Sequence, residues 1–295
     1  MTRVRGWLFP GLIVGPVLLV VALSRCGVPL AVAALPAIVV SMVVIAILER
    51  VFPRDPAVDL FSDPQAPRDA VHGLLTGVVG SSIGSVTAVA LLAAVFGDGD
   101  GLGWWPTGGP FVAQVAGAWL LYTFGDYWKH RAYHSVDALW WVHAMHHDVT
   151  GMHVLKGARL HFLEGTVRAG VVALPLLALG VPGEVLVWAT TLESLLGNLN
   201  HSNLDQRLAK WLHWLVPTVD LHHIHHAVDR SLHDTNLGTP LFDLAFGTYT
   251  PPAVAPRPVI GIAQPIVPAT LAGQLLFPFR QWRRRGAGRS VGASA

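Results

Sequence analysis

The sequence predicts an all-α membrane protein with four transmembrane helices, a re-entrant helical hairpin and a cytoplasmic helical cap that is rich in histidine. Two features of the composition lead to this fold class. The chain of 295 residues is 52% hydrophobic and only 13% charged, whereas soluble domains are about 25% charged. Of its 15 histidines, 14 fall between His130 and His233. The composition therefore indicates a membrane protein with one chemically specialised region.

The composition also excludes several kinds of site. Cys26 is the single cysteine, and a disulfide framework, a cysteine-based zinc site and an iron–sulfur cluster each need several cysteines. The net charge of +2 is too small to indicate binding to nucleic acid. A metal site in this chain would therefore have to use imidazole. The basic run from Arg283 to Arg285 is typical of an anchor at a membrane surface.

Four runs without charged residues predict the transmembrane helices. A helix that rises about 1.5 Å per residue needs about 20 residues to cross a bilayer core of about 30 Å, and a charge at the bilayer centre is costly. The predicted spans cover about residues 6–24, 27–48, 70–96 and 108–128. The first run lacks a small-residue cleavage site, so we expect a retained anchor rather than a cleaved signal peptide.

A fifth apolar stretch, residues 169–196, predicts the re-entrant hairpin. The segment from Gly180 to Glu184 interrupts it with glycine and proline, which end helices. Each remaining arm is too short to cross a bilayer, so the arms are expected to enter and return on the same side. The apolar stretch 258–279 carries four prolines, and we expect it to pack on the cap or at the membrane surface.

The charge of the loops predicts the orientation. Basic residues are concentrated before the first span, between the second and third, and after the fourth, whereas the other two loops carry only Arg25 and the pair Asp98 and Asp100. Because cytoplasmic loops carry the excess of basic residues, both termini and the histidine-rich region are expected in the cytoplasm. His72, which lies outside the cluster, is expected to be structural.

Three histidine boxes predict a metal centre. They read His130-Arg-Ala-Tyr-His134, His143-Ala-Met-His146-His147 and His222-His223-Ile-His225-His226. Residues three and four apart share one helix face, so each box forms a ridge of imidazoles, with His223 turned away. Eight imidazoles are too many for one metal ion, whereas two ions with several nitrogen ligands each account for them. Imidazole suits iron, zinc, copper and nickel.

Further motifs follow the boxes in a fixed order. Arg159-Leu-His161-Phe-Leu-Glu164 and Asn200-His201-Ser202-Asn203 precede the third box, and Asp234-Thr-Asn236-Leu-Gly238 and Leu241–Tyr249 follow it. From about Asp126 to Tyr249, these motifs and the boxes resemble the fatty acid hydroxylase and sterol desaturase superfamily of membrane di-iron enzymes. The chain departs from that family's R-x-H-P-x-E motif, because Phe162 stands where proline is usual.

The resemblance implies that nine histidines hold two iron ions: His130, His134, His143, His146, His147, His201, His222, His225 and His226. Some relatives have a further histidine one turn before the residue that matches His201, and this chain has Gly197 there. The resemblance makes His161 an additional candidate ligand, with Asn200 or a water molecule as alternatives.

Carboxylates near the boxes are candidates to orient the ligand imidazoles by accepting their N–H groups. Glu164, Asp148 and Asp234 are the nearest in sequence, and Asn236 is a further candidate support. The implied organisation is a transmembrane region over residues 1–125, a catalytic domain over 126–250 that contains the hairpin, and a C-terminal apolar segment with a basic tail over 251–295.

The resemblance implies an O2-dependent oxidoreductase that hydroxylates or desaturates an unactivated C–H site of a membrane lipid. A sterol or fatty-acyl lipid is the expected substrate class, with a carotenoid hydroxylase or an alkyl-lipid monooxygenase as alternatives. Electrons would come from a reductase with a ferredoxin or a cytochrome b5-like protein. A histidine-rich metal transporter or a haem protein is the alternative of a different class. Either would place ligands within the spans, which hold at most His72.

Overall fold

The computed structural model describes residues 2–97 and 101–286, so Asp98 and Asp100 lie outside the described residues. The described residues form helices and contain no strand. Two isolated bridges, Pro53 with Leu204 and Ala227 with Ile260, are their β-type pairings. The all-α prediction is therefore confirmed for the part of the chain that the structure describes.

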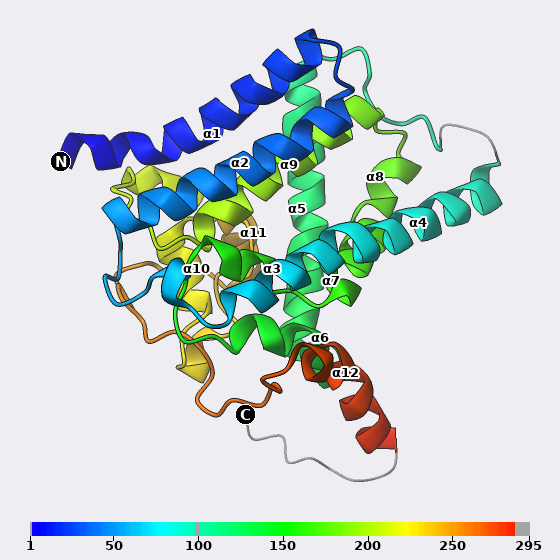
Figure 1. Cartoon of the computed structure of the whole chain (residues 1–295). Helices are drawn as coiled ribbons and strands as arrows, with labels where there is room; N and C mark the ends of the chain where they lie inside the picture. The colour runs from blue at the N-terminus through cyan, green and yellow to red at the C-terminus, as the bar shows by residue number, and fades with distance from the viewer. Residues whose placement is uncertain (1, 98–100, 287–295) are drawn as a thin grey trace.

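Six longer helices form the frame of the molecule (Figure 1). They are α1 (Thr2–Arg25), α2 (Leu30–Val51), α4 (Ser81–Phe96), α5 (Phe111–Ser135), α9 (Gly183–Asn200) and α12 (Leu271–Gly286). The shorter helices are α3 (Ala66–Leu74), α6 (Asp137–His147), α7 (Phe162–Val167), α8 (Leu174–Ala178), α10 (Val219–His225) and α11 (Pro240–Phe246). Single turns of 3-10 or π type connect them: η1 (Leu60–Ser62), η2 (Leu75–Gly80), η3 (Val154–Ala158), η4 (Arg168–Val172), η5 (Lys210–Trp214) and η6 (Arg230–Leu232).

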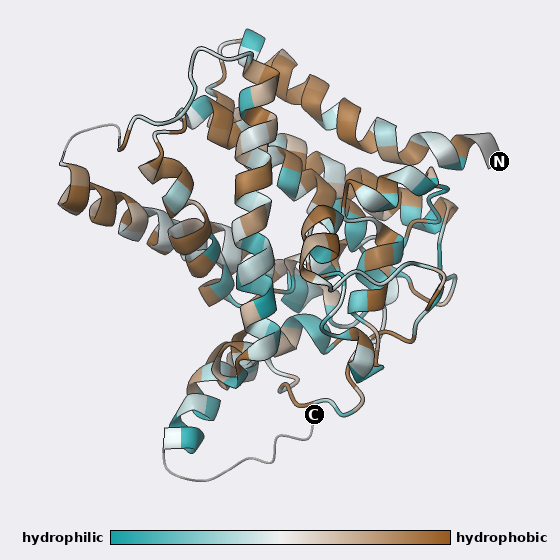
Figure 2. Cartoon of the chain, turned by 180° about the vertical axis from the view of Figure 1, so that it is seen from behind, coloured by the Kyte–Doolittle hydropathy of each residue, from teal (hydrophilic) through white to brown (hydrophobic). Residues whose placement is uncertain are grey.

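Three segments are long and apolar enough to cross a membrane. They are Val4–Arg25, Leu30–Val51 and Ala66–Phe96, the last formed by α3, η2 and α4 without a break. They coincide with the first three predicted spans. Large apolar side chains such as Val43 and Val89 are exposed on them, and Figure 2 shows these helices in the hydrophobic colour over much of their length. Such exposure is expected of helices that face lipid.

The fourth predicted span corresponds to α5, which continues past it into the first histidine box. This helix is not among the described segments that length and composition mark as candidate spans, because the predicted span 108–128 contains Gln114 and reaches past its charge-free run to Asp126. Its crossing of the membrane therefore stays a prediction.

The break in the fifth apolar stretch lies where the sequence places it. Helix α8 ends at Ala178 and α9 begins at Gly183. Between them Gly180 has φ 82°, a left-handed conformation that glycine adopts readily. Helix α9 is longer than the predicted arm, since it continues to Asn200.

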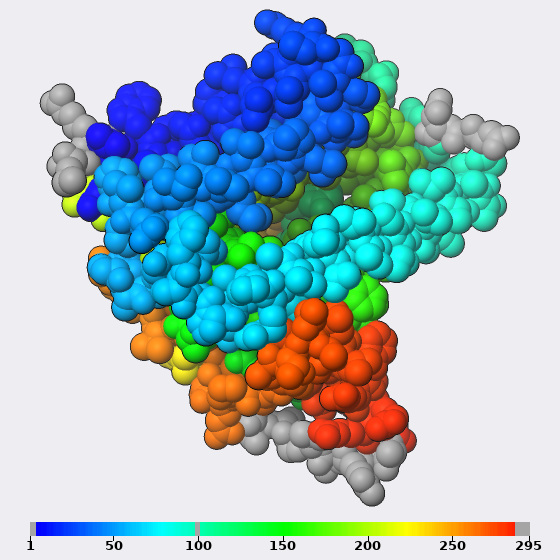
Figure 3. All heavy atoms as spheres, in the orientation of Figure 1, coloured from blue at the N-terminus to red at the C-terminus, as the bar shows by residue number. Residues whose placement is uncertain are grey.

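Helix α9 lies at the centre of the packing, against α1, α2 and α5. On the other side, η2 and α4 lie very close to α7 and η4. A methyl group at Gly80 would lie 2.1 Å from the carbonyl oxygen of Phe162, and one at Gly84 would lie 2.3 Å from that of Thr166. Small residues at this spacing let helix backbones touch. The space-filling view shows a hollow between α2 and α4 (Figure 3).

The C-terminal helix α12 packs on α6. The indole N–H of Trp282 in α12 donates to the carbonyl oxygen of Ala138 at 2.7 Å. His72, which is fully buried, lies 2.9 Å from the side-chain oxygen of Gln274. His72 is thus a structural residue that joins α3 to α12.

A buried ionic network joins α3 to α6. Asp69 accepts hydrogen bonds from Lys156 at 2.8 Å and from Arg159 at 2.7 Å, and the three side chains are at most 2% exposed. Arg159 also donates through Nε to the carbonyl oxygen of Met145 in α6 at 2.8 Å. The network therefore fixes the helix that carries the second histidine box relative to the third candidate span.

Asp69→Asn is expected to destabilise the fold strongly. The change leaves the buried charge of Arg159 without its carboxylate, and breaking a buried pair costs about 3–5 kcal/mol. Thermal unfolding in detergent, followed by circular dichroism, measures the effect. The control is Asp137→Asn, whose carboxylate pairs with Arg285 at 3.3 Å with both side chains exposed, and which should cost at most about 1 kcal/mol. Equal effects of the two changes would contradict the role assigned to the network.

Candidate metal centre

The nine histidines singled out from the sequence come together in two groups. His130, His134, His143, His147 and His225 form group A, and His146, His201, His222 and His226 form group B. Within each group, one ring nitrogen per residue lies within 4.8 Å of the others. The two groups are neighbours, because the rings of His147 and His226 stack with their centroids 4.3 Å apart.

The helix period explains how each HxxHH box serves both groups. Residues four apart share a face, so His143 and His147 of α6 both belong to group A, while His146 on the flank of the same helix belongs to group B. The third box mirrors this arrangement. His222 and His226 belong to group B and His225 to group A. Helices α6 and α10 thus each contribute to both groups.

The Nε2 atoms converge within each group. In group A, Nε2 of His143 lies 3.0 Å from that of His130 and 3.2 Å from that of His147. In group B the successive Nε2 distances are 3.1, 2.8 and 3.1 Å along His146, His201, His222 and His226. Ligand nitrogens at right angles around a metal at about 2.1 Å are about 3 Å apart. The donor sets therefore fit metal ions.

The other ring nitrogen of several histidines is fixed by the protein. In three of them the Nδ1–H group donates to a backbone carbonyl oxygen: His130 to that of Leu237 at 2.5 Å, His225 to that of Thr235 at 3.0 Å, and His201 to that of Gly197 at 2.8 Å. In His143 the Nδ1–H group donates to Oε2 of Glu164 at 3.1 Å. A proton on Nδ1 leaves the lone pair of Nε2 free for a metal. The buried Nε2 atoms of His134 and His225 have no hydrogen-bond partner among the described residues, as unfilled ligand atoms would.

Burial also sets the protonation of the site. It lowers the pKa of the imidazoles on α6 and α10 well below the usual value of histidine, namely those of His143, His146, His147, His222 and His226. These rings are therefore neutral, the form that binds metal. Burial raises the pKa of Glu164 to about 8. Lys129 and Arg168 offset the effect of burial only in part, so positive charge beyond theirs is needed to keep this carboxylate ionised at neutral pH.

The motif from Arg159 to Glu164 supports α6 from outside the groups. Arg159 holds the carbonyl of Met145, and Glu164 contacts His143, as expected for a carboxylate that orients a ligand. His161 lies in neither group. Its Nδ1 accepts from the amide of Leu163 at 3.3 Å and caps α7, and its Nε2–H donates to Leu275 O at 3.0 Å. Both nitrogens are occupied, so the expectation of His161 as an additional ligand is not supported.

Asn236 supports the site through the backbone. Its φ is 53°, in the left-handed region that asparagine tolerates better than most residues. The turn brings the carbonyls on either side, those of Thr235 and Leu237, to the Nδ1 atoms of His225 and His130. The Asn236 amide group bonds the carbonyls of Leu221 and Thr250 and the amide of Thr250.

The other two candidate carboxylates do not contact an imidazole within hydrogen-bond distance in the described structure. Asp234 Oδ1 is 3.9 Å from Nδ1 of His134 and its side chain is 75% exposed. Asp148 accepts from the amide of Val267. The histidines outside the two groups bond elsewhere: His153 to Asp63, His213 to Thr218, His223 to Ser202 O and His233 to Ala227 O.

A third cluster, Asp63, Asp69 and His153, also has the spacing of metal ligands. Lys156 lies 2.6 Å from Asp63 and 2.8 Å from Asp69, and Arg159 lies 2.7 Å from Asp69. Because these cations already neutralise both carboxylates, we interpret the cluster as an ionic network.

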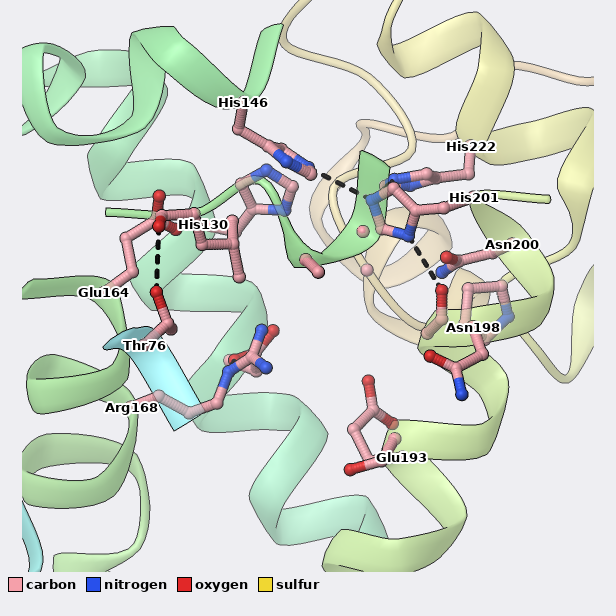
Figure 4. A pocket seen from close by; sticks show the side chains of 18 of the residues that line it. Thr76, His130, His146, Glu164, Arg168, Glu193, Asn198, Asn200, His201 and His222 are labelled. Atoms are coloured by element: carbon pink, nitrogen blue, oxygen red, sulfur yellow. Dashed lines mark hydrogen bonds and ion pairs between the residues drawn. The ribbon is translucent and has the colours of Figure 1, made fainter. Parts of the chain in front are cut away.

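A cavity of about 310 Å³ lies beside both groups (Figure 4). Histidines from both groups line one side: His130, His143, His146, His201 and His222. Charged side chains line the rest, namely Asp126, Lys129, Glu164, Arg168 and Glu193. Of these, Glu164 belongs to a motif singled out above. Glu193 carried a sequence signal, since a lone acidic residue in an apolar stretch often marks a functional site. Asn200 also lines the cavity, and its buried Oδ1 lacks a partner among the described residues.

Comparisons with known proteins match the same part of the chain that the motifs cover. Residues 115–248 match the sequence profile of the family described as fatty acid hydroxylase. An ornithine lipid hydroxylase of Rhizobium tropici is 30% identical over 257 residues, which cover 83% of this chain and 75% of that protein. An alkylglycerol monooxygenase of Xenopus tropicalis is 28% identical over 138 residues, which cover 45% of this chain and 30% of that protein. No solved structure matches the chain significantly.

The matched region contains all nine histidines of groups A and B. Motif order, geometry and comparison thus lead to one conclusion: this chain belongs to the fatty acid hydroxylase superfamily.

Proposed function

We propose that this protein is a membrane-bound di-iron monooxygenase that uses O2 to hydroxylate an unactivated C–H site of a membrane lipid. The observation that carries the proposal is the convergence of nine imidazoles in two neighbouring groups, of which five histidines, drawn from both groups, line one cavity. Hydroxylation is favoured over desaturation because the two relatives are named as a hydroxylase and a monooxygenase.

Group A would hold one iron ion and group B the other. When bound, the two ions would supply the activation of O2 that attack on an unactivated C–H bond requires. The surrounding chain fixes the ligands. Glu164 orients His143, and the carbonyls of Thr235 and Leu237 orient His225 and His130. Burial of the rings excludes bulk water and keeps them neutral.

The lining of the cavity bears on the substrate. A sterol skeleton or a carotenoid is almost wholly apolar and would leave Arg168 and Glu193 facing hydrocarbon, at a high desolvation cost. A lipid with a polar headgroup pairs with such side chains. We therefore favour a polar lipid, in line with the ornithine lipid named for one relative, over the sterol class expected from the sequence.

The proposed topology follows the sequence analysis. Helices α1, α2 and the continuous α3–α4 segment cross the membrane, α5 forms a fourth crossing, and residues 169–196 dip into the same leaflet as a hairpin. Residues 126–250 and both termini face the cytoplasm, where a reductase with a ferredoxin or a cytochrome b5-like protein would deliver electrons. The hollow between α2 and α4 would admit lipid sideways, because Ile38 of α2 and Thr76 of η2 line the cavity.

Lipid analysis of cells with and without the protein tests the activity. We expect one polar lipid to gain 16 mass units in cells that contain it. A loss of 2 mass units would indicate desaturation instead. Purified protein with no bound iron, or with the optical spectrum of a haem, would contradict the di-iron proposal.

His146→Ala should abolish turnover and leave the protein folded and inserted, because it removes a ligand of group B and no part of a span. The loss should exceed the 10–100-fold, in rough terms, that follows the loss of a residue supporting a metal ligand. Product formation, iron content and circular dichroism measure the outcome. The control is His213→Gln, since His213 lies in neither group. Activity retained in His146→Ala would count against the assignment of group B.

Asn236→Val should weaken iron binding without removing a ligand. A β-branched residue at φ 53° is strained, so the carbonyls of Thr235 and Leu237 would move away from His225 and His130. We expect a loss of about 10–100-fold in iron affinity. Asn236→Gly, which tolerates this φ but lacks the side-chain bonds, should fall between Asn236→Val and the wild type. Unchanged iron affinity in Asn236→Val would contradict the role given to the turn.

A further inference from the structure

The cavity beside the histidines presents two opposite charges that do not pair with each other. Arg168 and Glu193 both line it, and no ion pair within 4.0 Å joins them in the described part of the chain. Figure 4 shows them on facing sides, with the labelled histidines toward one end. A ligand that carries both charges would contact both side chains at once.

In the described part of the chain, no carboxylate lies within 4.0 Å of the forked Nη end of Arg168. One carboxylate oxygen, Oδ1 of Asp126, contacts both Nζ of Lys129 at 2.6 Å and Nε of Arg168 at 3.2 Å. The contact to Arg168 uses Nε and leaves the forked Nη end of the guanidinium, on a side chain that is 43% exposed. This planar fork matches a carboxylate.

The opposite wall carries a single carboxyl group, that of Glu193. Oε2 of Glu193 accepts a hydrogen bond from the indole N–H of Trp119 at 2.9 Å. The indole N–H of Trp119 carries no charge, so this hydrogen bond holds the Glu193 carboxylate in place without neutralising it. Glu193 forms no ion pair among the described residues. The free oxygen is suited to an ammonium group.

We propose that the cavity binds a zwitterionic amino-acid headgroup, with its carboxylate on Arg168 and its ammonium on Glu193. The proposal rests on the lipid hydroxylation proposed above and names the substrate class. The headgroup would then lie beside the histidines of both groups that line the same cavity. The carbon that reacts would therefore belong to the headgroup or to the first atoms attached to it, while the acyl chains leave past Ile38 through the hollow between α2 and α4.

Binding of three matched lipids tests the charge assignment. The probes are Nα-lauroyl-ornithine, its methyl ester, which lacks the carboxylate charge, and Nα-lauroyl-norleucine, which has a methyl group where ornithine has its ammonium. Titration calorimetry with the full-length, iron-loaded protein in detergent, without O2, measures affinity without turnover. Lauroyl phosphoethanolamine is a fourth probe, with a phosphate as its anion.

The wild type should bind Nα-lauroyl-ornithine about 10-fold or more tightly than the ester and the norleucine lipid, because each lacks one buried charge-assisted hydrogen bond. Glu193→Gln should abolish the preference over norleucine and keep the preference over the ester. Arg168→Gln should do the reverse. Arg168→Lys, which keeps the charge and loses the fork, should retain part of the preference over the ester.

Two exposed residues provide matched controls. Glu184→Gln removes an exposed carboxylate from the first turn of the same helix as Glu193, and Arg207→Gln removes an exposed guanidinium. Neither should change any of the preferences. A wild type that binds the three amino-acid lipids equally, or variants of Arg168 and Glu193 that keep both preferences while folded, would overturn the proposal. Tighter binding of the phosphoethanolamine lipid would overturn the assignment of a carboxylate.

The subsite and the activity can fail separately. Charge-dependent binding as expected, with no lipid gaining 16 mass units in cells, would overturn the proposed function and leave the subsite standing. Hydroxylation of a lipid without a charged headgroup would overturn the subsite and leave the hydroxylase standing.

Discussion

The structure is organised around one electrostatic constraint: the Nε2 atoms of neighbouring imidazoles lie about 3 Å apart, and in His130 and His143, whose Nδ1–H groups donate elsewhere, the two Nε2 lone pairs face each other. Such an arrangement is unfavourable without a cation between the rings, and the rings are too deeply buried to be relieved by bulk water. The supporting contacts therefore have to hold the rings in place. Three kinds do so: backbone carbonyls on Nδ1 atoms, the carboxylate of Glu164, and the guanidinium of Arg159 at the end of α6.

Further polar contacts join the apolar helices to the histidine-rich half of the protein. Asp69 at the start of the third candidate span holds Lys156 and Arg159. In the last turn of α2, Glu49 accepts hydrogen bonds from the amides of Val154 and Asn203, at 2.8 and 2.7 Å. Asn203 follows His201 by two residues. The positions of histidines in both groups thus depend on polar anchors at the ends of apolar helices.

Local periodicity made part of this structure predictable. Spacings of three and four placed the histidines of each box on one side of a helix, and the break around Gly180 was visible as glycine and proline. The division into groups of five and four was not, because each group draws histidines from helices that lie far apart in the sequence. Arg168 and Glu193 meet one cavity from segments 25 residues apart, and no short motif encodes that proximity. The sequence motif made His161 a candidate ligand. Its actual partner, the carbonyl oxygen of Leu275, lies 114 residues further along the chain, so the sequence alone could not reveal it.

On the proposed function, the hollow between α2 and α4 would have a kinetic consequence. A lipid that enters the cavity laterally from the bilayer never dissolves in water, so the enzyme would meet its substrate only as a component of the membrane. Its rate would then follow the mole fraction of substrate in the membrane, and adding more bilayer at constant substrate would slow it by dilution. The composition of the surrounding leaflet thereby becomes a variable of the reaction, alongside oxygen and reductant.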